Sequence, residues 1–221
     1  MGAPFHYKLR QQNCWLSPER MLFWEEQQTL VVSDLHFGKT GHFRKEGIAV
    51  PQSVYKEDLQ RLLSQLQFFQ PRSLIVVGDM FHSRANKELD WFKKWRADFP
   101  DLEIQLVMGN HDILQQQWYA EAGVTISPEA MTMGDFSFVH DVNSVTANSQ
   151  STIPGYLFSG HIHPGIRVSG TGKQSLQFPC FYFTPAYCVL PAFSRFTGLA
   201  MLRPKAADHV FAIVNQSVIQ V

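Results

Sequence analysis

Five short motifs in this chain of 221 residues combine side chains that bind metal ions or transfer protons. In chain order they are Asp34-Leu35-His36, Gly78-Asp79, Gly109-Asn110-His111-Asp112, His140 and Gly160-His161-Ile162-His163. Alternation along a strand puts residues i and i+2 on one face, so Asp34 with His36, and His161 with His163, can each meet one ion. A carboxylate together with an imidazole suits a first-row transition ion better than calcium. The motifs therefore predict a transition-metal site.

Each motif, taken singly, also has an ordinary structural explanation. Asp79 follows a glycine after an apolar run. A carboxylate there acts as a helix cap or turn residue as readily as a ligand, although burying it is costly without a partner. His140 by itself is typical of a hydrogen-bonded core histidine. The motifs gain weight together because six of the nine histidines lie in or beside them: His36, His82, His111, His140, His161 and His163.

The segments around the motifs predict the elements that must hold them. Short apolar runs precede the motifs and are typical of buried strands: residues 30–32, 74–77, 104–108, 136–139 and 156–158. Apolar spacings of three and four predict helices over 55–69 and over 89–99, with Asn86 as the N-cap of the second. A third helix is expected over 112–122, ending at Gly123.

Alternating strands and helices indicate an α/β fold, in which ligands bind beyond the carboxyl ends of the strands. Residues 187–191, 199–202 and 210–214 predict further strands. Together with the N-terminal region 15–24, we expect these segments to form a second sheet packed on the first. The length fits a single domain spanning residues 1–221.

The charge balance restricts how the chain can attract a polyanion. Lys plus Arg and Asp plus Glu number 19 each, so binding of a phosphate backbone requires a local basic patch or bound metal. Cys14, Cys180 and Cys188 are expected to be reduced thiols. The N-terminal residues lack a signal-peptide pattern, and no apolar stretch approaches the ~20 residues of a membrane span. We therefore expect a cytoplasmic protein that does not enter a membrane.

The order of the motifs over residues 30–165 resembles the calcineurin-like metallophosphoesterase superfamily. The resemblance implies an α/β, four-layer sandwich in which helices flank two packed mixed β-sheets. It implies that two divalent ions are held by seven residues, with Asp79 bridging: Asp34, His36, Asp79, Asn110, His140, His161 and His163. The first ion would take Asp34, His36 and His163, the second would take Asn110, His140 and His161, and Asp79 would contact both.

A narrower resemblance extends over nearly the whole chain. Residues 33–39, 42–44, 47–51, 78–83 and 190–198 are similar to the bacterial ligase-associated DNA-damage-response endonuclease family (PdeM-type). This resemblance implies a manganese-dependent phosphodiesterase that acts on DNA, with a DNA ligase and a helicase as partners. Iron and zinc are the alternatives that the ligand types allow. Protein-phosphatase relatives typically continue the second motif to Asp-Arg-Gly, which this chain lacks, and a phosphoprotein substrate is therefore not favoured.

The expected reaction is hydrolysis of a phosphodiester bond by in-line attack of a metal-bridging hydroxide. Two divalent ions, two carboxylates and one hydroxide sum to about +1, which suits a phosphodiester monoanion. His111 is expected to face the leaving group as a catalytic acid, with Asp112 as its orienter. Substrate binding is assigned to four residues: Lys39, His42, Arg44 and His82.

Alternatives remain open for the basic cluster and for the substrate. Residues 39–45 are also typical of a solvated loop, whereas a phosphate clamp beside the metals would supply the missing basic patch. A phosphoesterase for small esters, such as nucleotides or cyclic nucleotides, uses the same ligands. A non-catalytic metal-binding scaffold is the third interpretation. It predicts lost ligands, and each motif retains its own.

Overall fold

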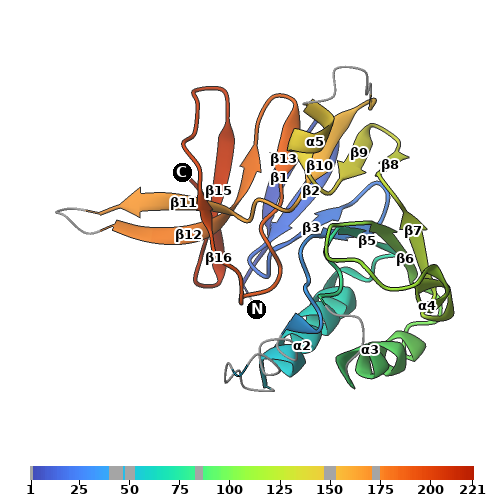
Figure 1. Ribbon diagram of the computed structural model, residues 1–221. Coiled ribbons are helices and arrows are strands. Elements are labelled where there is room, and N and C mark those ends of the chain that lie inside the picture. The colour runs from blue at the N-terminus through green and yellow to red at the C-terminus, as the bar shows by residue number, and fades with distance from the viewer. Residues whose placement is uncertain (1, 40–46, 48–52, 83–86, 147–152, 171–174) are drawn as a thin grey trace.

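The computed structural model describes residues 2–39, 47, 53–82, 87–146, 153–170 and 175–221. The expected N-cap Asn86 and the predicted substrate-binding residues His42 and Arg44 lie outside these ranges. Within them, the strands form two sheets that pack face to face (Figure 1). None of the described helices is both long and apolar enough to cross a bilayer.

The first sheet contains seven described strands in sequence order: β1 (Phe5–Leu9), β2 (Gln12–Ser17), β3 (Met21–Trp24), β4 (Thr29–Val32), β5 (Ser73–Val77), β6 (Glu103–Val107) and β7 (Val124–Ser127). β1 to β4 pair antiparallel, and β4 to β7 pair parallel. The expectation that region 15–24 joins the second sheet is therefore wrong. β3 instead continues directly into β4, with Leu22 opposite Val31, so tight antiparallel pairing extends the first sheet.

Three of the described helices cover the outer face of the first sheet: α2 (Ser53–Phe69), α3 (Lys87–Ala97) and α4 (Gln116–Glu121) (Figure 1). Leu62 and Leu66 of α2 and Phe92 of α3 are buried in one cluster with strand residues such as Leu74. α4 is shorter than the helix expected over 112–122. Residues 109–112 form a turn instead, in which the amide of Asp112 donates to the carbonyl of Gly109.

The second sheet is formed by later strands: β8 (Ala130–Met133), β9 (Phe136–Val139), β10 (Tyr156–Ser159), β11 (Pro164–Ser169), β12 (Ser175–Phe183), β13 (Tyr187–Val189), β14 (Ala200–Met201), β15 (His209–Val214) and β16 (Ser217–Gln220). β9, β10 and β13 run parallel, whereas the other pairings, except that of β11 with β14, are antiparallel. Among the described residues, the helical layer on this side is reduced to α5 (Val142–Thr146) (Figure 1).

β5 shows how one strand serves both layers of the core. Leu74 and Val76 pack with the helices, whereas Ile75 and Val77 pack between the sheets against residues that include Phe138. Burying a side chain of this size stabilises the fold by roughly 1.5–3 kcal/mol. Because Ile75 and Val77 pack against the second sheet, Asp79, which follows the carboxyl end of β5, lies at the junction of the two sheets.

Candidate metal centre

The first group of candidate ligands combines one carboxylate with two imidazoles. Asp34 and His36 follow β4, and His163 immediately precedes β11. Ligand atoms of the three residues all lie within 4.8 Å of one another. Asp34 is fully buried, and its Oδ1 lies 3.4 Å from Nε2 of His163. These donors are typical of a transition-metal site.

The second group has the same composition. Asp79 follows β5, His140 follows β9 and His161 follows β10, and their ligand atoms also lie within 4.8 Å of one another. Oδ1 of Asn110 lies 3.1 Å from Nε2 of His140, so the amide oxygen joins the group. Nδ1–H of His140 donates to the carbonyl of Val77 at 3.2 Å. That bond leaves the lone pair of Nε2 for an ion. In metal-binding histidines the other ring nitrogen commonly donates a hydrogen bond in this way.

Asp79 lies between the two groups. Its Oδ2 is 3.9 Å from Nε2 of His36 in the first group, and its Oδ1 is 3.5 Å from Nε2 of His140 in the second. Its carboxylate is also fixed from behind, because the amide of His111 donates to Oδ1 at 2.9 Å. One carboxylate therefore faces both groups of imidazoles.

The protonation of His36 and Asp34 tests whether the first group fits a metal. Both ring nitrogens of His36 are buried and have no hydrogen-bond partner in the part of the chain that the structure describes. Burial lowers the pKa of His36 to about 3, so the ring is the neutral imidazole that binds metals. Burial opposes ionisation of Asp34, but the hydrogen bond and charge of His163 and the Ser33 hydroxyl leave its pKa below the ordinary value. A cation here would bind one ring nitrogen of His36 and the carboxylate of Asp34.

The backbone at five candidate ligands adopts left-handed conformations. The φ angles are 53° at Asp34, 49° at His36, 51° at Asp79, 66° at His161 and 54° at His163. Such angles are costly for residues with a Cβ and tend to cluster at functional sites. The sequence predicts that the pairs Asp34/His36 and His161/His163 converge by alternation along a strand, and this explanation is wrong. They lie beyond the strands, and turns in the backbone aim them at the site.

Two glycines lie so close to candidate ligands that a side chain at either position would overlap them. A Cβ at Gly78, where φ is +78°, would lie 1.9 Å from Nδ1 of His140. A Cβ at Gly109 would lie 2.2 Å from Oδ1 of Asp79 and 2.4 Å from the backbone nitrogen of the same residue. Both glycines are thus required by close approach to a candidate ligand.

His111 and His82 lie at the rim of the centre. Nε2 of His111 is 3.9 Å from Oδ2 of Asp79, and 40% of the His111 side chain remains exposed. The rings of His111 and His82 are 4.4 Å apart between centroids, and each lies 5.5 Å from the ring of His36. His111 therefore combines closeness to the centre with access to solvent.

Asp112, predicted to orient His111, has its described hydrogen bonds elsewhere. Its Oδ2 accepts from the amide of Gly109 at 2.9 Å, and its Oδ1 accepts from the amide of Phe81 at 3.1 Å. Burial raises the pKa of Asp112 to about 6, against the effect of these two hydrogen bonds. Asp112 thus joins the turn carrying Asn110 to the segment that follows Asp79.

Lys39 brings a positive charge to the two carboxylates. Burial lowers its pKa, and the charges of Asp34 and Asp79 oppose that shift. Its backbone amide donates to the carbonyl of His36 at 3.1 Å. Of the predicted basic cluster, this is the part whose position is described.

A support for Asp34 lies outside the five metal-type motifs, in the segment 190–198 that only the family resemblance singled out. The amides of Phe193 and Ser194 donate to the carbonyls of Ser33 and Asp34 at 2.9 and 3.2 Å. This support loop, residues 192–194, is held in turn by two arginines. Arg20 donates to the carbonyls of Ala192 and Ser194, each at 3.0 Å, and Arg61 donates to the carbonyl of Phe193 at 3.1 Å. Contacts that span more than 130 positions leave no local signal in the sequence.

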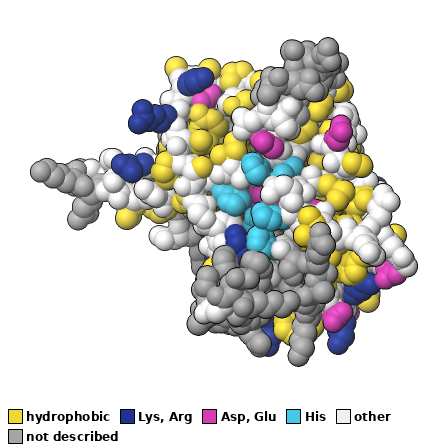
Figure 2. All heavy atoms as spheres, viewed as in Figure 1, with side chains coloured by type: hydrophobic (Ala, Val, Ile, Leu, Met, Phe, Trp, Pro, Cys, Tyr) yellow, Lys and Arg dark blue, Asp and Glu magenta, His cyan; other side chains and the backbone are white. Residues whose placement is uncertain are grey.

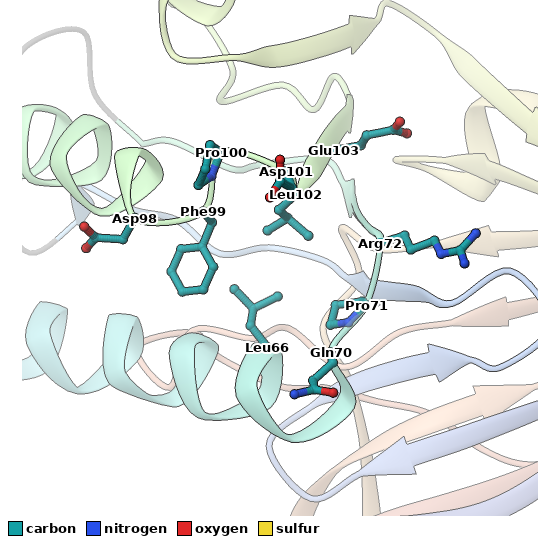
Figure 3. A pocket seen from close by; sticks show the side chains of 10 residues that line it. All are labelled: Leu66, Gln70, Pro71, Arg72, Asp98, Phe99, Pro100, Asp101, Leu102 and Glu103. Atoms are coloured by element: carbon teal, nitrogen blue, oxygen red, sulfur yellow. The ribbon is translucent and has the colours of Figure 1, made fainter.

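The histidines gather on one open face of the molecule, with acidic side chains between and beside them (Figure 2). A separate cavity of about 540 Å³ lies at the amino ends of β5 and β6, where it is lined by residues that include Leu66, Phe99 and Leu102 (Figure 3). Because the candidate ligands follow the carboxyl ends of the strands, this cavity lies at the opposite edge of the first sheet.

Residues 28–163, more than half of the chain, match the calcineurin-like phosphoesterase family. The structure is similar to that of the Pseudomonas putida nuclease MPE, with 25% sequence identity, a TM-score of 0.81, and 99% of this chain and 100% of that chain covered. It also matches the E. coli phosphoesterase YfcE at 14% identity, covering 87% of this chain and 97% of that one with a TM-score of 0.46. Among curated proteins, none matches. The resemblance and the α/β two-sheet fold expected from the sequence are confirmed, and the chain belongs to the calcineurin-like phosphoesterases, a family of metal-dependent hydrolases.

Proposed function

We propose that this phosphoesterase hydrolyses phosphodiester bonds in DNA with two divalent ions, of which manganese is the first choice and iron or zinc the alternatives. The observation that carries the proposal is the pair of adjacent ligand groups joined by Asp79. Asp34, His36 and His163 would hold one ion, Asn110, His140 and His161 the other, and Asp79 both.

Bound ions would supply Lewis acidity at the phosphoryl group and a nucleophile from water at neutral pH. The chain itself supplies two buried carboxylates, whose negative charge leaves a pair of divalent ions with net positive charge. A monoanionic diester is therefore attracted to the centre without neutralising it completely. His36 remains a neutral ligand, so the carboxylates set this balance.

His111 is the proposed general acid at the leaving oxygen. It is partly exposed, and its Nε2 lies 3.9 Å from Oδ2 of Asp79, where it would reach the leaving oxygen of a bound ester. Lys39 would stabilise negative charge on the phosphate from beside the same carboxylates, and His82 would contact the substrate at the rim. His42 and Arg44 complete the proposed substrate-binding residues.

The choice of DNA is supported by the nuclease from P. putida, which matches the chain over 99% of its length. A role in DNA repair, a cytoplasmic location, and a DNA ligase and helicase as partners belong to the same proposal. They follow from the family resemblance of residues 33–51 and 190–198.

The deciding experiment compares three substrates at saturating manganese: single-stranded DNA, duplex DNA and bis-p-nitrophenyl phosphate. The proposal expects hydrolysis of the small diester and at least one DNA substrate, with both activities removed by a chelator and restored by metal. Hydrolysis of small esters without cleavage of either DNA would support the small-ester function instead. If the protein binds two ions per chain but hydrolyses none of the three substrates, the result would support the non-catalytic metal-binding scaffold.

A further inference from the structure

A basic surface adjoins the metal centre along the hairpin formed by β11 and β12. β11 begins at Pro164, immediately after the candidate ligand His163, and pairs with β14. The amide of Ala200 in β14 donates to the carbonyl of His163 at 3.0 Å. Arg167 lies within β11, and Arg203 and Lys205 follow β14. All three side chains are exposed, and we call them the basic strip.

The three side chains of the basic strip have no ion-pair partner among the described residues. No side-chain hydrogen bond or ion pair joins Arg167, Arg203 or Lys205 to those residues. The nearby carboxylate of Asp208 is occupied by the hydroxyl of Tyr182 and the backbone amide of Lys205. In contrast, the side chains of Arg20 and Arg61 donate hydrogen bonds to carbonyl groups of the support loop. The strip therefore presents unneutralised positive charge to solvent.

The position of the strip suits a long substrate that crosses the metal centre. A strand rises about 3.3 Å per residue, so the four positions from His163 to Arg167 correspond to about 13 Å. Over that length each strand of a duplex presents about four phosphates. On the face shown in Figure 2, Lys and Arg side chains lie near the base of the protruding hairpin of Figure 1, with hydrophobic and other side chains between them and the histidines.

We propose that the basic strip binds the phosphate backbone of DNA on one side of the scissile bond. The inference rests on the proposed DNA-directed function and adds to it the path of the substrate. It also resolves a difficulty raised by the charge balance of the chain. With 19 basic and 19 acidic residues, long-range attraction is weak, and affinity for a polyanion must come from a local surface such as this one.

The test is the double variant Arg167→Gln/Arg203→Gln, with Lys8→Gln/Lys94→Gln as a control of equal charge. Lys8 pairs with Asn13 at the far end of β1, and Lys94 lies in the last turn of α3, so both are remote from the metal centre. The oligonucleotide carries at least six nucleotides on either side of the cleaved bond. We expect KM for it to rise several-fold in the strip variant. The slope of log KM against log salt should fall by about 2, because each lost phosphate contact removes about 1.

Turnover of bis-p-nitrophenyl phosphate, which has no flanking phosphates, reports whether the strip variant is folded and its metal centre intact. Loss of both activities in parallel, with the control unaffected, would overturn the strip as a DNA surface. Unchanged KM and salt slope on the oligonucleotide would overturn it as well. If the unmodified protein hydrolyses the small diester but no DNA, the proposed function itself fails. That result is read before any variant is made, so the two failures are distinct.

Discussion

The candidate centre divides, residue by residue, into side chains that would hold ions and side chains that would act on the substrate. Asp79 is buried and faces both ligand groups, whereas the neighbouring His111 is partly exposed and makes a single 3.9 Å approach to it. The backbone amide of His111 also donates to the side-chain Oδ1 of Asp79. Two residues in contact therefore have separable roles.

Asp79→Asn and His111→Ala should fail in different ways. Asn removes the charge that both ions share, so metal content and activity should fall together. His111→Ala should keep two ions per chain and lose on the order of 10²–10⁴ in rate, the usual range for general acid–base catalysis. Metal analysis of the purified, manganese-saturated proteins, together with kcat on one substrate, separates the two cases. An emptied centre in His111→Ala would make His111 a ligand or a structural residue.

Among the elements, the short segments after the strands decide the site, and the sequence predicts them unevenly. Asp34, His36, Asp79 and the other metal-type residues are recognisable because their motifs are local and follow apolar runs. The left-handed backbone at Asp34 and His163 has no such signal, since glycine is the residue expected at positive φ. The sequence also does not predict that β2 and β3 belong to the first sheet. Pairing between strands depends on packing partners that periodicity does not identify.

Gly109→Ala tests whether close approach at one turn controls the whole centre. Its methyl group would overlap Oδ1 and the backbone nitrogen of Asp79, so Asp79 or the turn carrying Asn110 must move. We expect loss of at least one ion per chain and of most activity. Gly170→Ala is the matched control, because a Cβ there meets nothing within 4 Å. Metal content and kcat equal to those of the control would show that the turn relaxes without cost to the site.

Arg20→Gln tests the support loop behind Asp34. The loss of two hydrogen bonds from a partly buried guanidinium to the carbonyls of Ala192 and Ser194 should cost about 1–3 kcal/mol of stability. Because the same loop donates to the carbonyls of Ser33 and Asp34, affinity for manganese should fall as well. Arg195→Gln removes an equal charge from an exposed arginine whose described contact is with Glu19, and serves as control. A lower Tm with unchanged manganese affinity would limit Arg20 to a structural role.

For the molecule as a whole, the candidate centre is a junction between the two sheets. Asp34, Asp79 and Asn110 come from segments that follow strands of the first sheet, whereas His140 and His161 follow strands of the second. Direct hydrogen bonds join the two sides at the centre, such as that from the amide of His161 to the carboxylate of Asp34. Residues 1–221 therefore remain predicted as one domain, in which bound ions would tie the layers together.

Removal of metal should consequently lower the stability of the entire fold. Without ions, the buried carboxylates of Asp34 and Asp79 lose their proposed cation partners, and the stabilisation that metal binding gives to the folded state is lost. At a manganese concentration 100 times its Kd, one site contributes about 2.7 kcal/mol, which corresponds to a Tm about 5–10 °C higher in a chain of this size. Thermal unfolding after chelation and after manganese is restored measures this difference. Asp79→Asn should show a much smaller response to manganese than the unmodified protein. An equal rise in Tm for both would place the stabilising ions away from this centre.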